Sequence, residues 1–168
     1  FDEPQPVALQ IQAFDDQDQT PAGRVKSLEK LLDQGAGDFE TVIVDTSVMN
    51  MPATSFSLVA NRIIKEKHGL PCGGAYSNGT HMWKDAKTIW SLDGFKAMDA
   101  VVQGMASVIW SDFNFYGPIV TAPRIFPAVA AGHILLSTLL YDETKRIPDN
   151  PDLPIKKYFG EFLEKLTA

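Results

Sequence analysis

Four stretches typical of β-strands, each followed by a helical pattern, constrain most strongly what this chain can fold into. The clearest is residues 41–44, Thr-Val-Ile-Val, a β-branched run typical of a strand buried on both faces in a parallel sheet. The other three strand candidates are residues 7–14, 71–76 and 112–116. Helical patterns follow over residues 20–35, 55–68, 92–109 and 128–141. Four successive strand-then-helix units predict an α/β fold with a parallel sheet and right-handed crossovers.

Four such units form either an open sheet with two long edges or half of a TIM (β/α)8 barrel. A complete barrel needs about 250 residues, and this chain has 168. The chain also begins with Phe1 rather than Met and enters a strand almost at once. We therefore expect residues 1–147 to be strands five to eight, the C-terminal half of a barrel whose N-terminal half is missing. Residues 148–168 are expected to be a proline-rich link and a C-terminal amphipathic helix.

Composition excludes several classes of function. The net charge of -6, with Lys and Arg scattered along the chain, argues against a nucleic-acid partner and against an anionic membrane surface. A single cysteine cannot form an intrachain disulfide, and no Cys and His cluster has the spacing of a zinc site, so we expect no metal. The uninterrupted apolar runs are shorter than the roughly 20 residues of a membrane span. We therefore expect a cytoplasmic protein without a membrane span.

The candidate site centres on residues 70–79, which the pattern predicts to be a short strand followed by a polar, glycine-flanked loop. Ser77 and Asn78 fall at the end of this strand, where an amide can bridge to ligand ring nitrogens without bringing in charge. Cys72 precedes two glycines, which favours packing over a role as a methylated thiolate. Gly117 closes the fourth strand in a similar way.

Asp45 follows the buried strand 41–44 directly, at the place where parallel α/β sheets position ligand-binding groups. The alternative is that its carboxylate caps a turn with Thr46 and Ser47. On the first strand, Gln10 and Gln12 alternate with aliphatic residues, which suits a solvated sheet face and a binding mouth equally well.

Three further patterns concern packing. The two tryptophans Trp83 and Trp90 lie seven residues apart, which fits one face of a helix on the core or on a partner. An almost continuous apolar stripe over residues 95–109 is expected to be buried, and Pro127 is expected to open the next helix. His133, alone on an apolar helix, is interpreted as a core or interface residue.

Several of these motifs together resemble one known family. They are Val-Ile-Val-Asp-Thr at 42–46, Gly-Leu-Pro-Cys-Gly-Gly-Ala-Tyr-Ser-Asn at 69–78, Phe-Asn-Phe-Tyr-Gly-Pro-Ile at 113–119, Phe-Pro-Ala-Val-Ala at 126–130 and Thr-Pro-Ala-Gly-Arg at 20–24. Their order and spacing resemble the H subunit of tetrahydromethanopterin S-methyltransferase and its bacterial relatives, the methylcorrinoid:tetrahydrofolate methyltransferases of glycine betaine catabolism. The resemblance covers most of residues 7–143.

The resemblance implies a pterin-binding TIM barrel related to dihydropteroate synthase. Such an enzyme moves a methyl group between a corrinoid, either methylcobalamin or a corrinoid protein, and N5 of tetrahydrofolate or tetrahydromethanopterin. It implies that Asn78 lies near N5 as the catalytic residue and that Asp45 holds the pyrimidine edge of the ring. Ser77, Asp15 and Gly117 are expected as further cofactor contacts.

Two points remain open from the sequence. Arg24 meets the carboxylates of a folate tail or is a helix-surface arginine. The chain is a methyltransferase, expected as a homodimer with a corrinoid partner, or it is a non-catalytic docking or structural subunit of a methyltransferase complex. A dihydropteroate synthase is a third interpretation, disfavoured because an amide-bearing loop, and not a basic phosphate-binding loop, follows the third strand.

Overall fold

Four parallel strands form one sheet in the order of the sequence. The structure, a computed structural model, describes residues 8–36 and 39–167, so the first residue of the expected strand 7–14 lies outside the described part. The strands are β1 (Ala8–Gln12), β2 (Thr41–Asp45), β3 (Cys72–Gly74) and β4 (Phe113–Asn114). The predicted α/β fold with a parallel sheet is thereby confirmed.

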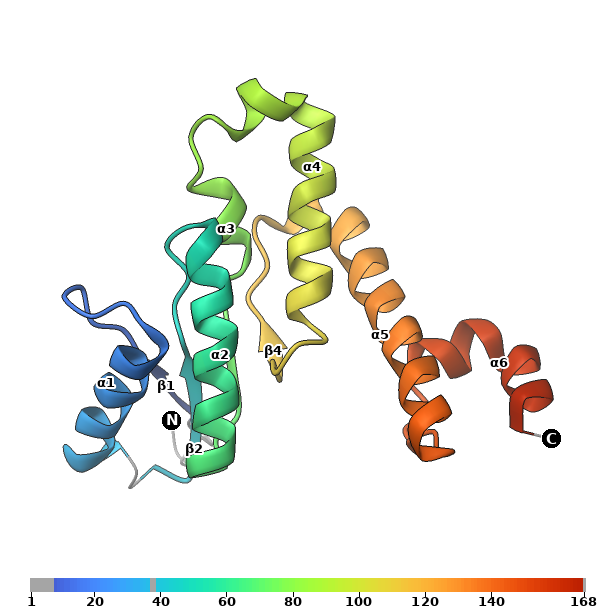
Figure 1. Ribbon diagram of the computed structural model, residues 1–168, viewed down its shortest axis with the longest axis horizontal. Helices are drawn as coiled ribbons and strands as arrows, with labels where there is room; N and C mark the ends of the chain where they lie inside the picture. Colours follow the sequence, from blue (N-terminus) through green and yellow to red (C-terminus); the bar gives the residue numbers. More distant parts are fainter. Residues whose placement is uncertain (1–7, 37–38, 168) are drawn as a thin grey trace, which may run out of the picture.

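Helices follow the strands and succeed one another across the molecule from α1 to α6 (Figure 1). They are α1 (Pro21–Asp33), α2 (Met51–His68), α3 (Ser77–His81), α4 (Ala86–Ala106), α5 (Ala122–Thr144) and α6 (Pro154–Thr167), with a short 3-10 helix η2 (Ile119–Thr121) before α5. The predicted helix signals at α1 are confirmed, because the Thr20 side chain accepts a hydrogen bond from Gly23 N and Pro21 takes the first helical position. Gly69 ends α2 in the left-handed region, with φ of 67°.

The core lies on one face of the sheet. Alternate strand residues, including Ile11, Val44 and Cys72, are buried together with Val25 of α1 and Ile64 of α2. Because side chains of a strand alternate between faces, the residues between them point to the opposite face. These are Gln10, Gln12, Ile43, Asp45 and Gly73, together with Phe113, which pairs with Gly73. Among the described residues the core cluster joins α1 and α2 to the first side alone, and we call the second side of the sheet the helix-free face.

The order of the strands and the side on which α1 and α2 lie indicate which type of parallel α/β fold the chain forms. A doubly wound sheet reverses its strand order and carries helices on both faces, whereas here the strands follow in sequence and the core cluster joins α1 and α2 to the same face. Parallel sheets are ordinarily covered on both faces. The order is that of (β/α) units in a barrel, and closure of such a barrel stays a prediction.

Several predicted element boundaries are wrong. Ser77 and Asn78 lie in the first turn of α3 and not in a loop. The helix expected from Ser55 begins at Met51, because Asn50 caps it by accepting from Ala53 N at 2.8 Å. The last long helix begins at Ala122 with a proline in its first turn, so Pro127 lies inside the helix rather than at its start.

The structure corrects in part the expectations for the tryptophans and for the apolar stripe. Trp83 lies before α4, which begins at Ala86, so the two tryptophans do not share a helix face. Trp90 is 54% exposed, and Val101 and Met105 of the stripe are each 56% exposed. The stripe is therefore only partly buried, because Phe95 lies in the interior at 4% exposure whereas Val101 and Met105 lie on the surface of α4.

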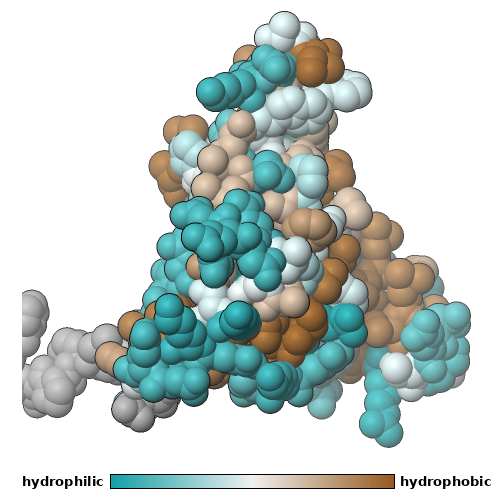
Figure 2. Space-filling model, turned by 60° about the vertical axis from the view of Figure 1, so that its left-hand side comes forward, coloured by the Kyte–Doolittle hydropathy of each residue, from teal (hydrophilic) through white to brown (hydrophobic). Residues whose placement is uncertain are grey.

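Apolar side chains reach the surface beside hydrophilic ones (Figure 2). One segment, Ile119–Thr144, is long and apolar enough to cross a membrane, and 11% of its most apolar window is buried. Length and composition alone are weak evidence for a span. The sequence prediction of no span rested on uninterrupted apolar runs, and this helix was missed because Arg124, Pro127 and His133 interrupt its apolar residues.

Candidate functional site

Asp45 lies at the carboxyl end of β2 on the helix-free face. It is 8% exposed, and its two oxygens accept hydrogen bonds from Ser47 N at 2.8 Å and from Gln10 Nε2 at 3.3 Å. Burial raises the pKa of the Asp45 carboxyl, while these two hydrogen bonds act in the opposite direction. No cation pairs with this carboxylate within the described residues. A buried carboxylate with only neutral donors has unused capacity to accept hydrogen bonds from a ligand.

The turn after Asp45 is held in a strained conformation. Ser47 has φ of 52°, a left-handed value that costs energy for a residue with a side chain. Gln12 Nε2 donates to Ser47 Oγ at 3.0 Å. The bond from Ser47 N to Asp45 confirms the turn-capping alternative, and a role of the Asp45 carboxylate in holding a ligand stays a prediction.

Arg24 fixes the same turn from α1. Its side chain is fully buried and donates to Thr46 O at 2.7 Å and to Ser47 O at 3.2 Å. Both roles expected from the sequence are therefore wrong, because a guanidinium committed to buried carbonyls is neither on the helix surface nor free for a folate tail. It belongs to the support of the site.

A buried polar network connects the end of β2 with the end of β3. Thr46 Oγ1 lies 2.7 Å from Asn61 Oδ1 and 2.6 Å from Ser57 Oγ. Asn61 Nδ2 in turn donates to the hydroxyl of Tyr76 at 2.8 Å. Tyr76 is fully buried and directly precedes Ser77. The network therefore positions the start of α3 relative to Asp45.

Asn78 carries a side chain that makes no hydrogen bond within the described part of the chain. Its backbone N–H donates to Ala75 O at 2.9 Å, which closes the first turn of α3. Ser77 beside it is 5% exposed, and a Cβ placed on Gly117 would lie 3.7 Å from Ser77 Oγ. The structure therefore brings Ser77 and Gly117 together and leaves the Asn78 amide available to a ligand.

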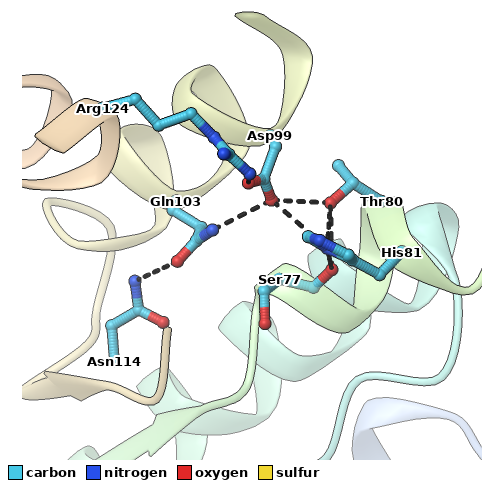
Figure 3. Close-up of polar contacts among 7 residues, drawn as sticks. All are labelled: Ser77, Thr80, His81, Asp99, Gln103, Asn114 and Arg124. Carbon is cyan, nitrogen blue, oxygen red and sulfur yellow. Dashed lines mark hydrogen bonds and ion pairs between the residues drawn. The ribbon is translucent and has the colours of Figure 1, made fainter. Parts of the chain in front are cut away.

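Asp99 of α4 is the centre of a second network, which the sequence patterns did not predict (Figure 3). Its carboxylate is fully buried and accepts from Thr80 Oγ1 at 2.7 Å and from Gln103 Nε2 at 2.9 Å. Arg124 Nη2 of α5 forms an ion pair with it at 2.6 Å. This network connects α3 to α4 and α5. The sequence pattern that could have revealed it is Asp99 itself, an acidic residue inside an apolar stripe, because a buried acidic side chain needs a partner.

Two other members complete that network. Gln103 Oε1 accepts from Asn114 Nδ2 of β4 at 3.3 Å, and His81 Nδ1 lies 2.9 Å from the Ser77 carbonyl oxygen (Figure 3). The end of β4 and the first turn of α3 are therefore held by one set of buried polar contacts. This accounts for the proximity of Ser77 and Gly117.

The structure does not bring Asp15 to the other predicted residues. Its carboxylate accepts from Gln17 N at 2.9 Å in an exposed turn, and it lines a hollow beside α1 together with Lys26 and Glu29. No contact with Asp45 or Asn78 is found among the described residues. A ligand contact at Asp15 stays a prediction without structural support.

Cys72 occupies the place expected of a packing residue, whereas the assignment of His133 to the core or to an interface stays a prediction. Cys72 is fully buried, and burial together with the charge of Asp112 raises the pKa of its thiol to about 12. A thiol with this pKa is not a nucleophile at neutral pH. His133 lines a cavity of about 510 Å³ between β4, α5 and α6. Across residues 8–36 and 39–167, no three His, Cys, Asp or Glu side chains are grouped to hold a metal ion.

Sequence comparisons connect the chain to known proteins. The sequence model of the tetrahydromethanopterin S-methyltransferase MtrH subunit matches residues 5–146. The H subunit of tetrahydromethanopterin S-methyltransferase from Methanosarcina barkeri is 31% identical over 126 residues, which is 68% of this chain and 38% of that protein. The corresponding proteins of Methanosarcina acetivorans and Methanosarcina mazei are 29% and 30% identical over the same length. The chain thus spans less than half the length of the curated relatives it matches.

Proposed function

Because the chain belongs to the family of the tetrahydromethanopterin S-methyltransferase MtrH subunit, we propose that it forms the pterin-binding part of a methyltransferase. The reaction is transfer of a methyl group between a methylcorrinoid, as methylcobalamin or a corrinoid protein, and N5 of a reduced pterin. The observation that carries the proposal is the pairing of a buried, cation-free Asp45 with the unengaged amide of Asn78. Asp45 ends β2, and Asn78 lies in α3, which follows the adjacent strand β3.

Asp45 suits the pyrimidine edge of a pterin. That edge presents a ring N–H beside an exocyclic amine, two parallel donors that a carboxylate accepts as a fork. Burial disfavours the negative charge of the Asp45 carboxylate, and hydrogen bonds from such a ligand would stabilise that charge. The turn at Ser47 is fixed by hydrogen bonds from the buried Arg24, which keeps the Asp45 carboxylate in position before the ligand binds.

Asn78 suits the reacting nitrogen. An amide accepts a hydrogen bond from N5 when that nitrogen carries a proton and donates to it when it does not. One residue can therefore follow the change in charge during transfer. Ser77 and Gly117 border the same place, and Gly117 leaves room there because it has no side chain.

The chemistry is a direct displacement. The lone pair of N5 attacks the methyl carbon, the cobalt–carbon bond breaks with its electron pair remaining on cobalt, and N5 releases its proton. The protein needs no nucleophile of its own, in agreement with a thiol at Cys72 that stays protonated. Its contribution is to align two bulky molecules and to exclude water.

A barrel completed by further strand-and-helix units fits this function. The sheet has helices on one face and an uncovered helix-free face that carries Asp45. We propose that the N-terminal half of a dihydropteroate-synthase-like TIM barrel pairs with the edges of β1 and β4 and encloses that face. The relatives are long enough to supply it, since this chain matches 38% of their length.

The test is methyl transfer by the natural full-length protein. With methylcobalamin as donor, we expect the visible spectrum to shift to that of the reduced corrinoid when tetrahydromethanopterin or tetrahydrofolate is added. The more active acceptor identifies the pterin, and the relatives' name makes tetrahydromethanopterin the first to try. Failure to transfer to either pterin, from methylcobalamin and from a methylated corrinoid protein alike, would contradict the proposal.

A docking subunit is the second candidate, and the exposed apolar surface of α4 and α5 favours it. Val101 and Met105 of α4 and Leu135 and Leu139 of α5 are each more than half exposed and lie around one shallow apolar hollow. Such a surface marks a contact with a protein partner or a second copy of the chain. The two functions differ at Asn78, because Asn78→Ala impairs transfer only if this chain carries the site.

A further inference from the structure

We propose that Phe113 is the stacking surface for the pterin ring and that Gly73 is required to keep its ring in that place. This inference rests on the proposed function and adds a residue that binds the face of the ligand rather than its edge. It follows from the side chains that the sheet places beside Asp45 on the helix-free face.

One row of paired residues crosses the whole sheet at the level of Asp45. Its members, one from each strand, are Gln12, Asp45, Gly73 and Phe113. Residues paired across parallel strands point to the same face, and neighbouring strands lie about 4.8 Å apart. The row therefore presents an amide, a carboxylate, a position without a side chain and an aromatic ring in that order.

Gly73 is the position over which the aromatic ring leans. A Cβ on Gly73 would lie 2.6 Å from Cδ2 and 2.7 Å from Cε2 of Phe113, and 2.3 Å from the Phe113 carbonyl oxygen. All three distances are below those that real Cβ atoms show. The ring of Phe113 thus occupies the space of the missing side chain and is displaced toward Asp45.

A second ring supports this arrangement. Phe115 lies two residues further along the chain, and its ring centroid is 5.0 Å from that of Phe113 with an angle of 55° between the planes. Phe115 is 39% exposed, whereas Phe113 is partly buried. The contact holds the Phe113 ring before a ligand binds, which lowers the entropy cost of stacking.

A pterin offers both surfaces that this row can bind. Its donor edge fits the Asp45 carboxylate, and its planar bicyclic face fits an aromatic ring in offset stacking. Two contacts at right angles, one to the edge and one to the face, fix the rotation of the ring as well as its position. That rotation decides where N5 lies relative to Asn78.

The competing explanation is that Phe113 only fills the interior of a closed barrel. A filling residue changes the free energy of unfolding when it is replaced and changes ligand affinity little. A stacking residue changes affinity and is rescued by another aromatic ring. The two roles are therefore separated by measuring both quantities on the same variants.

The experiment uses the natural full-length protein and tetrahydrofolate or tetrahydromethanopterin, with the dissociation constant measured by anaerobic calorimetry and stability measured by urea unfolding. For Phe113→Leu we expect about tenfold weaker binding or more, and for Phe113→Tyr affinity close to that of the unaltered protein. Phe56→Leu, at a 44% exposed phenylalanine of α2, is the matched control and is expected to bind normally. Gly73→Ala is expected to weaken binding and also to lower stability, because its Cβ would meet the Phe113 carbonyl oxygen at 2.3 Å as well as the ring.

Asp45→Asn separates this inference from the proposed function. If Asp45→Asn loses affinity and Phe113→Leu does not, Phe113 does not stack and the proposed function stands. If the unaltered protein binds neither pterin, both are wrong. If Phe113→Leu fails to fold, the test is the NMR chemical shift of the pterin C7 protons when the pterin binds to the unaltered protein. Stacking on an aromatic ring shifts these resonances upfield, and unchanged chemical shifts would overturn the inference.

Discussion

Replacing Asp45 by asparagine should weaken pterin binding and at the same time stabilise the protein at neutral pH. Asparagine keeps the shape of the side chain, and its oxygen can still accept the hydrogen bond from Ser47 N. It loses the negative charge that burial disfavours. A buried charge that binds a ligand but costs stability in the free protein is expected to give this combination of lost affinity and gained stability when it is removed.

The size of the binding effect follows from the hydrogen bonds that are lost. A carboxylate accepts both donors of the pterin edge as charge-assisted bonds, each worth about 1.5–3 kcal/mol, while an asparagine accepts one of them as a neutral bond. The loss of about 2–4 kcal/mol corresponds to roughly 30-fold to 1,000-fold weaker binding. The gain in stability is expected to be about 1 kcal/mol, a common size for removing such a local cost.

The stability gain should depend on pH in a defined direction. Because the pKa of Asp45 is raised on folding, the folded protein binds more protons than the unfolded chain between the ordinary and the raised pKa. The unaltered protein therefore loses stability relative to Asp45→Asn as the pH rises above about 4, the ordinary aspartate pKa. Below that pH both side chains are neutral and the difference disappears.

Urea unfolding between pH 3 and 8 and calorimetric titration with the pterin measure the two effects. Asp93→Asn is the matched control, since that carboxylate is 94% exposed on α4 and its replacement should change neither quantity. An Asp45→Asn protein that binds the pterin as tightly as the unaltered protein would show that the carboxylate does not hold the ring. A variant that is less stable at pH 7, with an unchanged pH dependence, would show that burial of the charge costs no stability.

Three further predictions concern packing and reactivity. In urea unfolding, Gly104→Ala should lower the free energy of unfolding by about 1–3 kcal/mol, because its Cβ would lie 2.9 Å from a backbone oxygen of α5. The control is Gly160→Ala, whose Cβ would have no atom within 4 Å and which should be neutral or stabilising. Asp99→Ala should cost about 3 kcal/mol by leaving a paired guanidinium without its counter-charge, and a loss under about 1 kcal/mol in thermal unfolding would contradict this. Cys72 should react with a thiol reagent at pH 8 only after urea is added, and rapid reaction of the folded protein would contradict its burial and its pKa of about 12.

The strand-and-helix alternation was predictable from sequence because its causes are local. The β-branched run of β2, the Thr20 cap and the Gly69 terminator each act within a few residues, and the structure confirms them. The alternation of glutamines with aliphatic residues on β1 also predicted correctly which residues face the core. Barrel closure could not be settled in this way, because four (β/α) units are compatible with an open sheet as well as with half of a barrel.

The site was predictable only in part. Asp45 follows a strand whose end is obvious, but Ser77 and Asn78 lie in a helix that Gly79 made improbable from propensity alone. The role of Arg24 depends on carbonyl groups 22 and 23 residues away, and the network of Asp99 joins four elements. Contacts over such separations are set by the tertiary fold and leave no local pattern.

The Asn78→Ala variant of the natural full-length protein decides whether this chain carries the reacting site, with kcat for methyl transfer and the dissociation constant of the pterin measured side by side. We expect the pterin still to bind through Asp45 while kcat falls by about tenfold to a thousandfold, the usual cost of losing one donor or acceptor at a reacting atom. Methyl transfer at an unchanged rate would contradict the assignment of Asn78 to N5. The site would then lie elsewhere, and the docking function would describe this chain better.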